Sequence, residues 1–214
     1  MGRSQKLSSR SAARWDDRMR LATLLRRPSV AGFAGLILLV CAAFPAAAQQ
    51  DPAVQFMDRV TKDLIAAQRT RSVQAMQLAI SRHGDVQAIG LFALGDYRAR
   101  LEPADREPYI SGMVKFIGRY AATEAPKYPV AKVTFAPESR KAKYGITVDS
   151  TITLQDGTTY EIAWLLMKYG SSYRVRDAQA LGFWMSPFLK KLFEDYIGQN
   201  NGNVKALVGV LQRH

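Results

Sequence analysis

Near residue 130 the spacing of apolar residues changes from helical to alternating, and this change constrains the fold more than any other feature of the chain. From there on, four segments alternate apolar and polar residues as half-buried strands do: 130–136, 146–154, 158–169 and 172–181. Asp156-Gly157 and Gly170-Ser171-Ser172 are hairpin signals between the last three segments. Because parallel strands need long crossover connections, these short turns predict an antiparallel meander.

Amphipathic helices are expected on both sides of these strands. Helical spacing of apolar residues marks the segments around 57–64, 73–80, 86–93, 107–122, 188–196 and 204–211. Asp85 is expected to cap the third helix, which ends at Gly95, and Asn203 the last one. Helices, then strands, then helices is an α+β order, with a four-stranded antiparallel sheet.

Residues 1–48 have the three parts of a secretory signal peptide. Arg20, Arg26 and Arg27 precede an apolar segment, and Ala46-Ala47-Ala48 form an A-x-A cleavage site. The segment 30–44 is shorter than the ~20 residues of a spanning helix, which favours a signal peptide over an anchor. We therefore expect cleavage after Ala48 and one mature domain, residues 49–214. Met1 and Met19 both fit as the translation start.

Cleavage changes the cysteine count and the charge of the chain. It removes Cys41, the single cysteine, so the mature domain has neither disulfides nor cysteine-ligated metals. The full chain has a net charge of +12, but residues 49–214 hold 22 basic and 16 acidic residues. This moderate excess, together with export, argues against nucleic acid as a partner.

Few residues suit catalysis or metal binding. His83 and His214 have no second metal-type residue at a suitable spacing, and no cofactor-binding motif is present. Asp149 and Asp177 lie within strands. Either would be a candidate base if buried beside an aromatic ring, and an ordinary exposed or arginine-paired carboxylate otherwise. No catalytic residue, metal ligand or cofactor is therefore assigned.

Two further stretches leave alternatives open. The basic residues of 140–143 and 190–191 are either solvated or in contact with an anionic headgroup, an anionic membrane surface or an acidic partner. The corner 182–188, GFWMSPF, has a glycine suited to a sharp turn and a proline suited to a first helical turn. Its large apolar residues either close the end of the core or line and gate a cavity.

The order of motifs resembles the MlaC, or toluene-tolerance, family over nearly all of the mature chain. The segment 93–122, ALGDYRARLEPADREPYISGMVKFIGRYAA, is similar to a family segment with Leu-Gly, a basic aromatic pair and a helix ending in Tyr. YRVRDAQALGFWMSPFLKKLF, 173–193, is similar to the family's strand, glycine and helix. Phe183-Trp184 after Gly182, and Tyr173 in place of Trp, depart from the family pattern and indicate a divergent subfamily.

The resemblance implies a cystatin-like or NTF2-like fold in which helices and a curved sheet enclose an apolar cavity. It implies a monomeric periplasmic carrier, not an enzyme, that moves phospholipid between an inner-membrane ABC transporter complex and an outer-membrane lipoprotein complex and so supports outer-membrane lipid asymmetry. A hopanoid-like lipid is a second expected cargo, because one related subfamily is associated with hopanoids.

With this resemblance, apolar residues from both helices and strands become candidate lipid-binding residues. They are Phe92, Tyr97, Met113, Phe116, Ile117, Tyr120, Val148, Ile162, Trp164, Leu166, Phe183, Trp184, Met185 and Phe188. Two other functions remain open: an NTF2-like lyase or isomerase for a small apolar substrate, and a ligand-free docking protein of a membrane complex.

Overall fold

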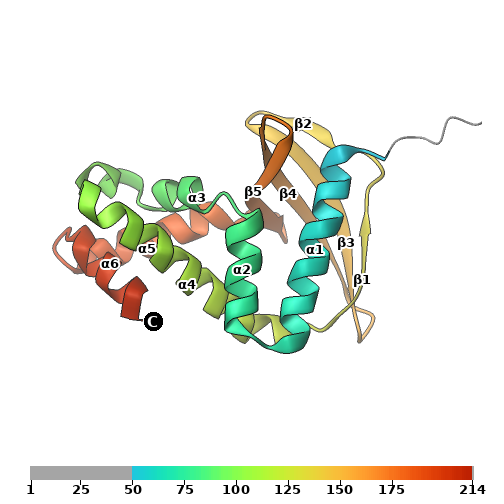
Figure 1. Ribbon diagram of the computed structural model, residues 1–214, viewed down its shortest axis with the longest axis horizontal. Coiled ribbons are helices and arrows are strands. Elements are labelled where there is room, and N and C mark those ends of the chain that lie inside the picture. The colour runs from blue at the N-terminus through green and yellow to red at the C-terminus, as the bar shows by residue number, and fades with distance from the viewer. Residues whose placement is uncertain (1–49, 214) are drawn as a thin grey trace, which may run out of the picture. The chain divides into compact units, whose positions relative to one another are not determined.

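The computed structural model describes residues 50–213, so the predicted signal peptide and its cleavage site lie outside the described residues. The fold is α+β, as predicted (Figure 1). Its helices are α1 (Pro52–Thr70), α2 (Val73–His83), α3 (Val86–Ala93), α4 (Arg106–Glu124), α5 (Met185–Gln199) and α6 (Val204–Arg213). Short 3-10 turns, η1 (Gly95–Arg100), η2 (Pro103–Asp105) and η3 (Ala125–Lys127), flank α4.

The sheet is antiparallel and contains the four predicted strands: β1 (Val130–Phe135), β3 (Gly145–Leu154), β4 (Thr159–Tyr169) and β5 (Ser172–Ala180). The predicted strand count was too low. β2 (Arg140–Ala142) pairs with β3, and β6 (Phe183–Trp184) pairs with β5. Strands of two or three residues are too short to show an alternating pattern. The predicted hairpin turns are confirmed, with Gly157 at φ 86° and Gly170 at φ 60°.

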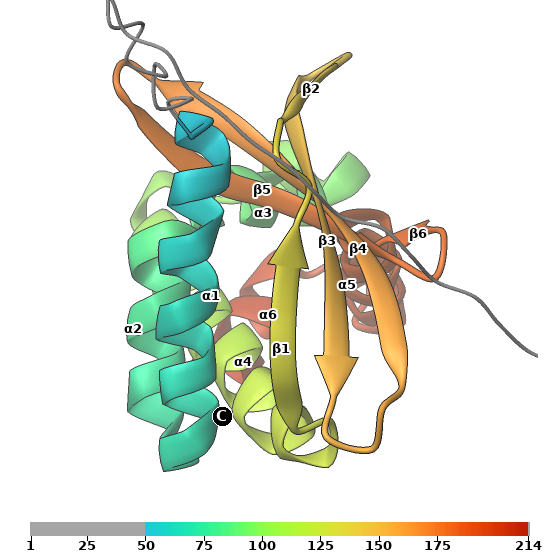
Figure 2. The same ribbon diagram turned by 90° about the vertical axis from the view of Figure 1, so that its right-hand side faces the viewer.

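The inner face of the sheet packs against α1, which lies beside α2 on one side of the sheet (Figure 2). The pairs Ile146–Leu166 and Val148–Trp164 bring the even-numbered side chains of β3 and β4 together on this face. Val148 and Leu166 are fully buried there. The one buried polar side chain in their row, Ser150, accepts a hydrogen bond from Trp164 Nε1 at 2.9 Å, so its burial leaves no unsatisfied group.

A second core joins α3, α4, α5 and α6. Leu94, Met113, Phe193 and Ile197 are its centre, each at most 1 % exposed. Tyr109 is buried among them and donates its hydroxyl to the carbonyl of Gly90 at 2.7 Å, while burial raises its pKa. The sheet core and this helical core share no member among the described residues, so the fold has two separate hydrophobic cores. We call the contact between them, centred on Asp85, the joint.

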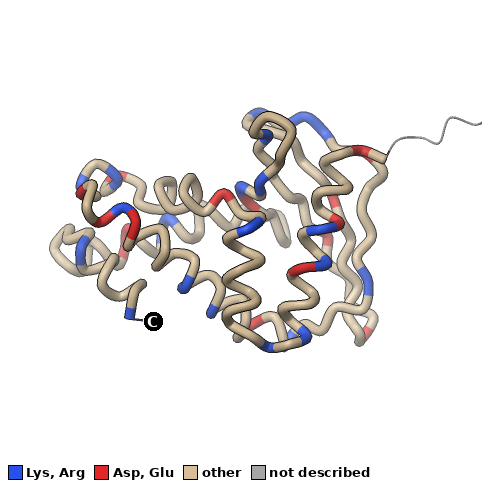
Figure 3. The backbone as a smooth tube through the Cα atoms, in the orientation of Figure 1, with Lys and Arg blue, Asp and Glu red and all other residues tan. Residues whose placement is uncertain are grey.

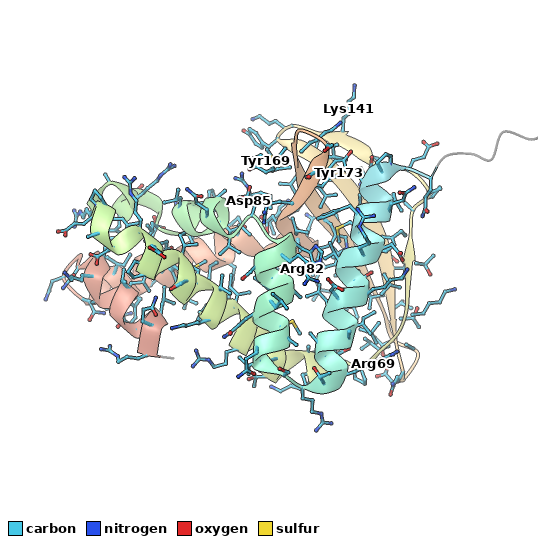
Figure 4. All side chains as sticks on the ribbon, viewed as in Figure 1. Arg69, Arg82, Asp85, Lys141, Tyr169 and Tyr173 are labelled. Carbon is cyan, nitrogen blue, oxygen red and sulfur yellow. The ribbon has the colours of Figure 1, made fainter. Side chains whose placement is uncertain are left out.

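Asp85 connects the two cores; it lies at the N-cap position of α3, as predicted, but the capping bond expected from its side chain is absent. Instead the carboxylate accepts the Tyr169 hydroxyl at 2.6 Å and the Arg176 guanidinium at 2.8 and 3.1 Å. Figure 4 shows Asp85 between the helices and Tyr169 of the hairpin above it. A charged guanidinium is a stronger partner for a buried carboxylate than a backbone amide is.

Asp51 fixes the start of α1 against the sheet. Its carboxylate accepts the amides of Ala53 at 2.7 Å and Val54 at 3.4 Å, and the amide and hydroxyl of Ser139 at 2.8 and 2.6 Å. Burial opposes ionisation, but these hydrogen bonds, led by those from Ser139, outweigh it and lower the pKa of Asp51. The ionised form of Asp51 therefore stabilises the folded state.

We predict that Asp51→Asn lowers the free energy of unfolding by about 1 kcal/mol at pH 7. Because the pKa of Asp51 is lower in the folded state, its ionic contribution is complete above about pH 4 and is lost as the pH falls through the folded-state value. Urea unfolding at pH 7 and pH 3 measures the difference, which should shrink at pH 3. Asp58→Asn, which breaks an exposed pair with Lys62, is the control and should change stability little.

Candidate functional site

An open apolar groove lies between α4, α5 and α6. Its volume is about 460 Å³, within the range of small-molecule sites. The residues that line it are Phe116, Arg119, Tyr120, Thr123, Glu124, Leu192, Phe193, Tyr196, Leu207, Val210 and Leu211. Most of them are apolar, so the groove suits a ligand with a long apolar part.

Helical spacing and one close helix contact create the groove. Phe116 and Tyr120 are one turn apart on α4, and Leu192 and Tyr196 are one turn apart on α5. Phe116 packs edge-on against Phe193 with ring centroids 5.8 Å apart. A Cβ at Gly112 would lie 2.8 Å from Leu211 Cβ, so the glycine lets α6 approach α4 closely. The glycine thereby brings α6 against α4 at Leu211, which also lines the groove.

The groove wall is only partly covered by the rest of the described chain. Tyr120 is 64 % exposed and Leu192 is 47 % exposed. Apolar side chains this exposed gain little from packing inside the domain, and a ligand that covered them would gain the free energy of burying their surface.

The polar residues of the groove all come from α4. Glu124 accepts from Lys127 at 2.8 Å, so its charge is compensated. Arg119 is partly buried at the wall and has no carboxylate within ion-pair distance among residues 50–213. One side of the groove thus offers a cation to a ligand whose apolar part lies along the other walls.

The corner between β5 and α5 continues this apolar surface. Leu181 and Gly182 form a two-residue turn with φ of 53° and 81°, flanked by the pair Ala180–Phe183. Four residues of this corner are largely exposed: Leu181 and Phe188 at 75 %, Phe183 at 73 % and Met185 at 45 %. We call them the apolar corner. Phe188 lies one turn before Leu192 on α5, so the apolar corner leads along α5 to the groove.

The structure brings two of the predicted lipid-binding residues, Phe116 and Tyr120, into the groove and places the others elsewhere. Met113, Val148 and Leu166 are fully buried core residues. Tyr97, Ile117, Ile162, Trp164 and Trp184 are partly buried, the first two against the helical core and Trp164 against the sheet core. Phe92, Phe183, Met185 and Phe188 are exposed.

Sequence reasoning did not select the groove residues of α5 and α6. Leu192 and Tyr196 belong to the expected apolar face of α5, and Leu207 and Leu211 to that of α6. The sequence assigned them to helices and gave them no ligand-binding role, and Leu207 and Leu211 are also members of the helical core. The apolar faces of these two helices are wider than packing against one neighbouring helix requires, and this width was the available signal. Which edge of each face remains uncovered depends on how the helices cross, and the sequence does not give that.

A second pocket of about 590 Å³ lies beside Asp85, and its charged side chains, Asp85 and Arg174, already have partners in the fold. Tyr169 donates to Asp85, and Arg174 donates from Nη1 to the carbonyls of Ser81, Arg82 and Gly84 at 3.2–3.4 Å. These bonds hold β5 to the end of α2. The groove, with an uncompensated cation and exposed apolar walls, is therefore the stronger candidate for a ligand site.

The titratable residues considered for catalysis or metal binding also have structural partners. Asp149 accepts two bonds from Arg140, both 2.8 Å, and Asp177 accepts the Ser186 amide at 2.9 Å near the start of α5. His83 Nε2 lies 2.7 Å from Asp63, and this bond is the main reason that the pKa of Asp63 is lowered. Within residues 50–213, no three metal-ligating side chains gather at one point.

Comparisons with known proteins agree with this architecture. A family model described as "MlaC protein" matches residues 53–213. The fold is similar to that of the phospholipid-binding protein from Ralstonia solanacearum, whose structure was solved in complex with a phospholipid. The two have a TM-score of 0.61 and 21 % identity over 74 % of this chain and 94 % of that one, a likeness that concerns the fold. Comparison with curated protein sequences gave no match.

None of the helices between residues 50 and 213 is both long and apolar enough to cross a membrane.

We predict that Leu181→Gly raises the free energy of unfolding by about 0.5–1 kcal/mol. A leucine at positive φ pays a steric cost that glycine does not, and this side chain is too exposed to gain much from packing. Thermal unfolding with Phe183→Ser as the control measures it, since Phe183 is equally exposed but lies outside the positive-φ turn. A clear loss of stability in Leu181→Gly would show that Leu181 packs against the domain.

Proposed function

The chain belongs to the MlaC family, and from this premise we propose that it is a periplasmic lipid carrier. It binds a phospholipid by its acyl chains in the groove of α4, α5 and α6. It carries that lipid between an inner-membrane ABC transporter complex and an outer-membrane lipoprotein complex. The phospholipid bound to the Ralstonia solanacearum protein of similar fold supports the choice of ligand.

The observation that carries the proposal is the open apolar groove with exposed walls. An acyl chain gains about 0.8 kcal/mol for each buried CH₂, so two long chains would gain roughly 20 kcal/mol before costs. Much of this gain offsets extraction from the bilayer, whose interior is equally apolar. A carrier therefore needs a groove that covers the chains along their length, and the surface from the apolar corner to Leu211 offers such a path.

The cation at the groove wall favours a phospholipid over a neutral lipid. Arg119 provides a guanidinium beside the apolar walls, and a phosphate diester is a ligand that guanidinium binds well. The acyl chains then lie against α5 and α6 with the headgroup near α4. A hopanoid-like lipid without a phosphate would fill the apolar part and leave Arg119 without a partner.

The proposal makes this protein a binding protein and not an enzyme. Lipid carriage breaks no bond, so it requires no general base or nucleophile. The two aspartates on which a lyase or isomerase would depend are bound to Arg140 and to the start of α5, away from the groove lining. A cargo that enters and leaves unchanged is consistent with this arrangement.

The decisive experiment is native mass spectrometry of the protein isolated from the periplasmic fraction without detergent, followed by organic extraction. Co-purified phospholipid near one molecule per chain would support the proposal, and a hopanoid would keep carriage but change the cargo. A mass equal to that of the bare chain, unchanged after incubation with liposomes, would overturn it. Recovery only in another cell fraction would contradict periplasmic carriage.

We predict that Leu192→Glu reduces co-purified lipid at least about tenfold, because it places a charge on the groove wall where an acyl chain must lie. Leu78→Glu is the matched control. Leu78 is also on a helix and is 58 % exposed against 47 % for Leu192, but it lies outside the groove. The thermal unfolding midpoints of both variants should stay near that of the unmodified protein.

Equal lipid content in the two glutamate variants would place the acyl chains elsewhere. A further variant, Tyr120→Glu, repeats the test from α4 on the opposite wall, where the side chain is 64 % exposed, so its replacement should leave the fold intact.

A further inference from the structure

We propose that the hairpin end of the sheet is a docking surface for anionic membrane lipids. This hairpin end consists of two segments. Residues 140–149 form β2 and the first half of β3, and residues 166–176 form the end of β4, the turn at 170–171 and the first half of β5. Register places both at the same end of the sheet, because Ile146 pairs with Leu166 and Tyr169 pairs with Ser172. The surface is separate from the groove and uses none of its residues.

The hairpin end holds most of the excess positive charge of the domain. Its two segments contain six basic residues and one acidic residue in 21 positions, and Asp85, which is paired with Arg176, reduces the excess from five to four. Residues 49–214 as a whole have an excess of six. Figure 3 shows lysines and arginines gathered at the upper end of the sheet. Such a concentration attracts an anionic surface over a distance set by ionic strength.

Three of these cations have no acidic partner among residues 50–213. Arg140 is paired with Asp149, Arg176 with Asp85, and Arg174 donates to backbone carbonyls. By contrast, Lys141, Lys143 and Lys168 are exposed, and no carboxylate of residues 50–213 lies within ion-pair distance of them. Their charges are available to an external partner.

Aromatic side chains accompany these lysines. Lys143 Nζ lies 4.9 Å from the centre of the Tyr144 ring, and Lys168 Nζ lies 5.9 Å from that of Tyr173. Tyr144 is 66 % exposed and Tyr169 is 50 % exposed. Tyrosine has an apolar ring and a polar tip, the combination that is enriched where membrane meets water. Lysine at the same depth reaches the phosphates with its flexible stem.

The arrangement favours a lipid surface over an acidic protein. Figure 2 shows that β2 and the β4–β5 turn stand apart from one another at the end of the sheet. Figure 4 shows Lys141 extending outward from that end, with Tyr169 and Tyr173 on the other hairpin. Charges spread over two separate projections match an extended layer of headgroups, whereas a single acidic peptide would need them along one path.

The inference rests on the proposed function for its purpose, since a lipid carrier must meet a membrane, but its test is independent of lipid carriage. The protein as isolated from cells, with its N-terminus verified by mass, is sedimented with vesicles of phosphatidylcholine alone or mixed with phosphatidylglycerol. We expect binding to the mixed vesicles only, and weaker binding as salt is raised.

The variant that carries the test is Lys141→Ser/Lys143→Ser/Lys168→Ser, which should weaken binding to the mixed vesicles by about tenfold or more. The matched control, Arg59→Ser/Lys132→Ser/Lys205→Ser, removes the same charge from exposed basic residues elsewhere and should bind nearly as the unmodified protein does. Tyr144→Ser should weaken binding further when combined with the first set.

Three results would overturn the inference: no binding to either vesicle, equal losses in the two triple variants, or full binding by the first. Binding to an acidic protein without binding to vesicles would count against it in the same way. Lipid extracted from each variant separates the two proposals. If the first triple variant keeps its lipid but no longer binds the vesicles, the docking proposal is supported. If the protein contains no lipid but still binds the vesicles, only the proposal of lipid carriage is contradicted.

Discussion

The buried carboxylate of Asp85 joins the sheet of this protein to its helices. It lies in the short turn between α2 and α3 and is held by Tyr169 from β4 and Arg176 from β5. Backbone bonds reinforce the same point, because the Asp85 amide donates to the Val175 carbonyl at 2.8 Å. A buried charge tolerates the loss of a partner poorly, so these directional bonds set the position of β5 against the helices.

The groove follows from having two cores instead of one. α1 covers the inner face of the sheet, and Tyr109 and Phe193 fill the space among α3, α4, α5 and α6. Neither core uses the open edges of α4 and α5, where Tyr120 and Leu192 remain exposed. A single larger core would have buried these side chains and left no groove.

The sequence predicted the secondary-structure elements better than it predicted which residues contact one another in the folded chain. The helices, the antiparallel meander, the Asn203 cap and the turns at Gly157 and Gly170 depend on residues close together in the chain, and all are confirmed. The role of Asp85 depends on Arg176, far along the chain, and could not be read locally. Likewise Met113 and Phe116 share one apolar face of α4, and only the approach of α6 at Gly112 places the first in the core and the second in the groove.

The concentration of positive charge at the hairpin end also affects how the domain moves before it touches anything. With an excess of four charges at one end of the sheet, Asp85 included, and of two over the remainder, the positive charge of the domain is unevenly distributed. Near any negatively charged surface it experiences a torque that turns this end forward. Encounter is then selective in orientation before any contact forms, and the groove of α4, α5 and α6 arrives at a fixed angle to the surface.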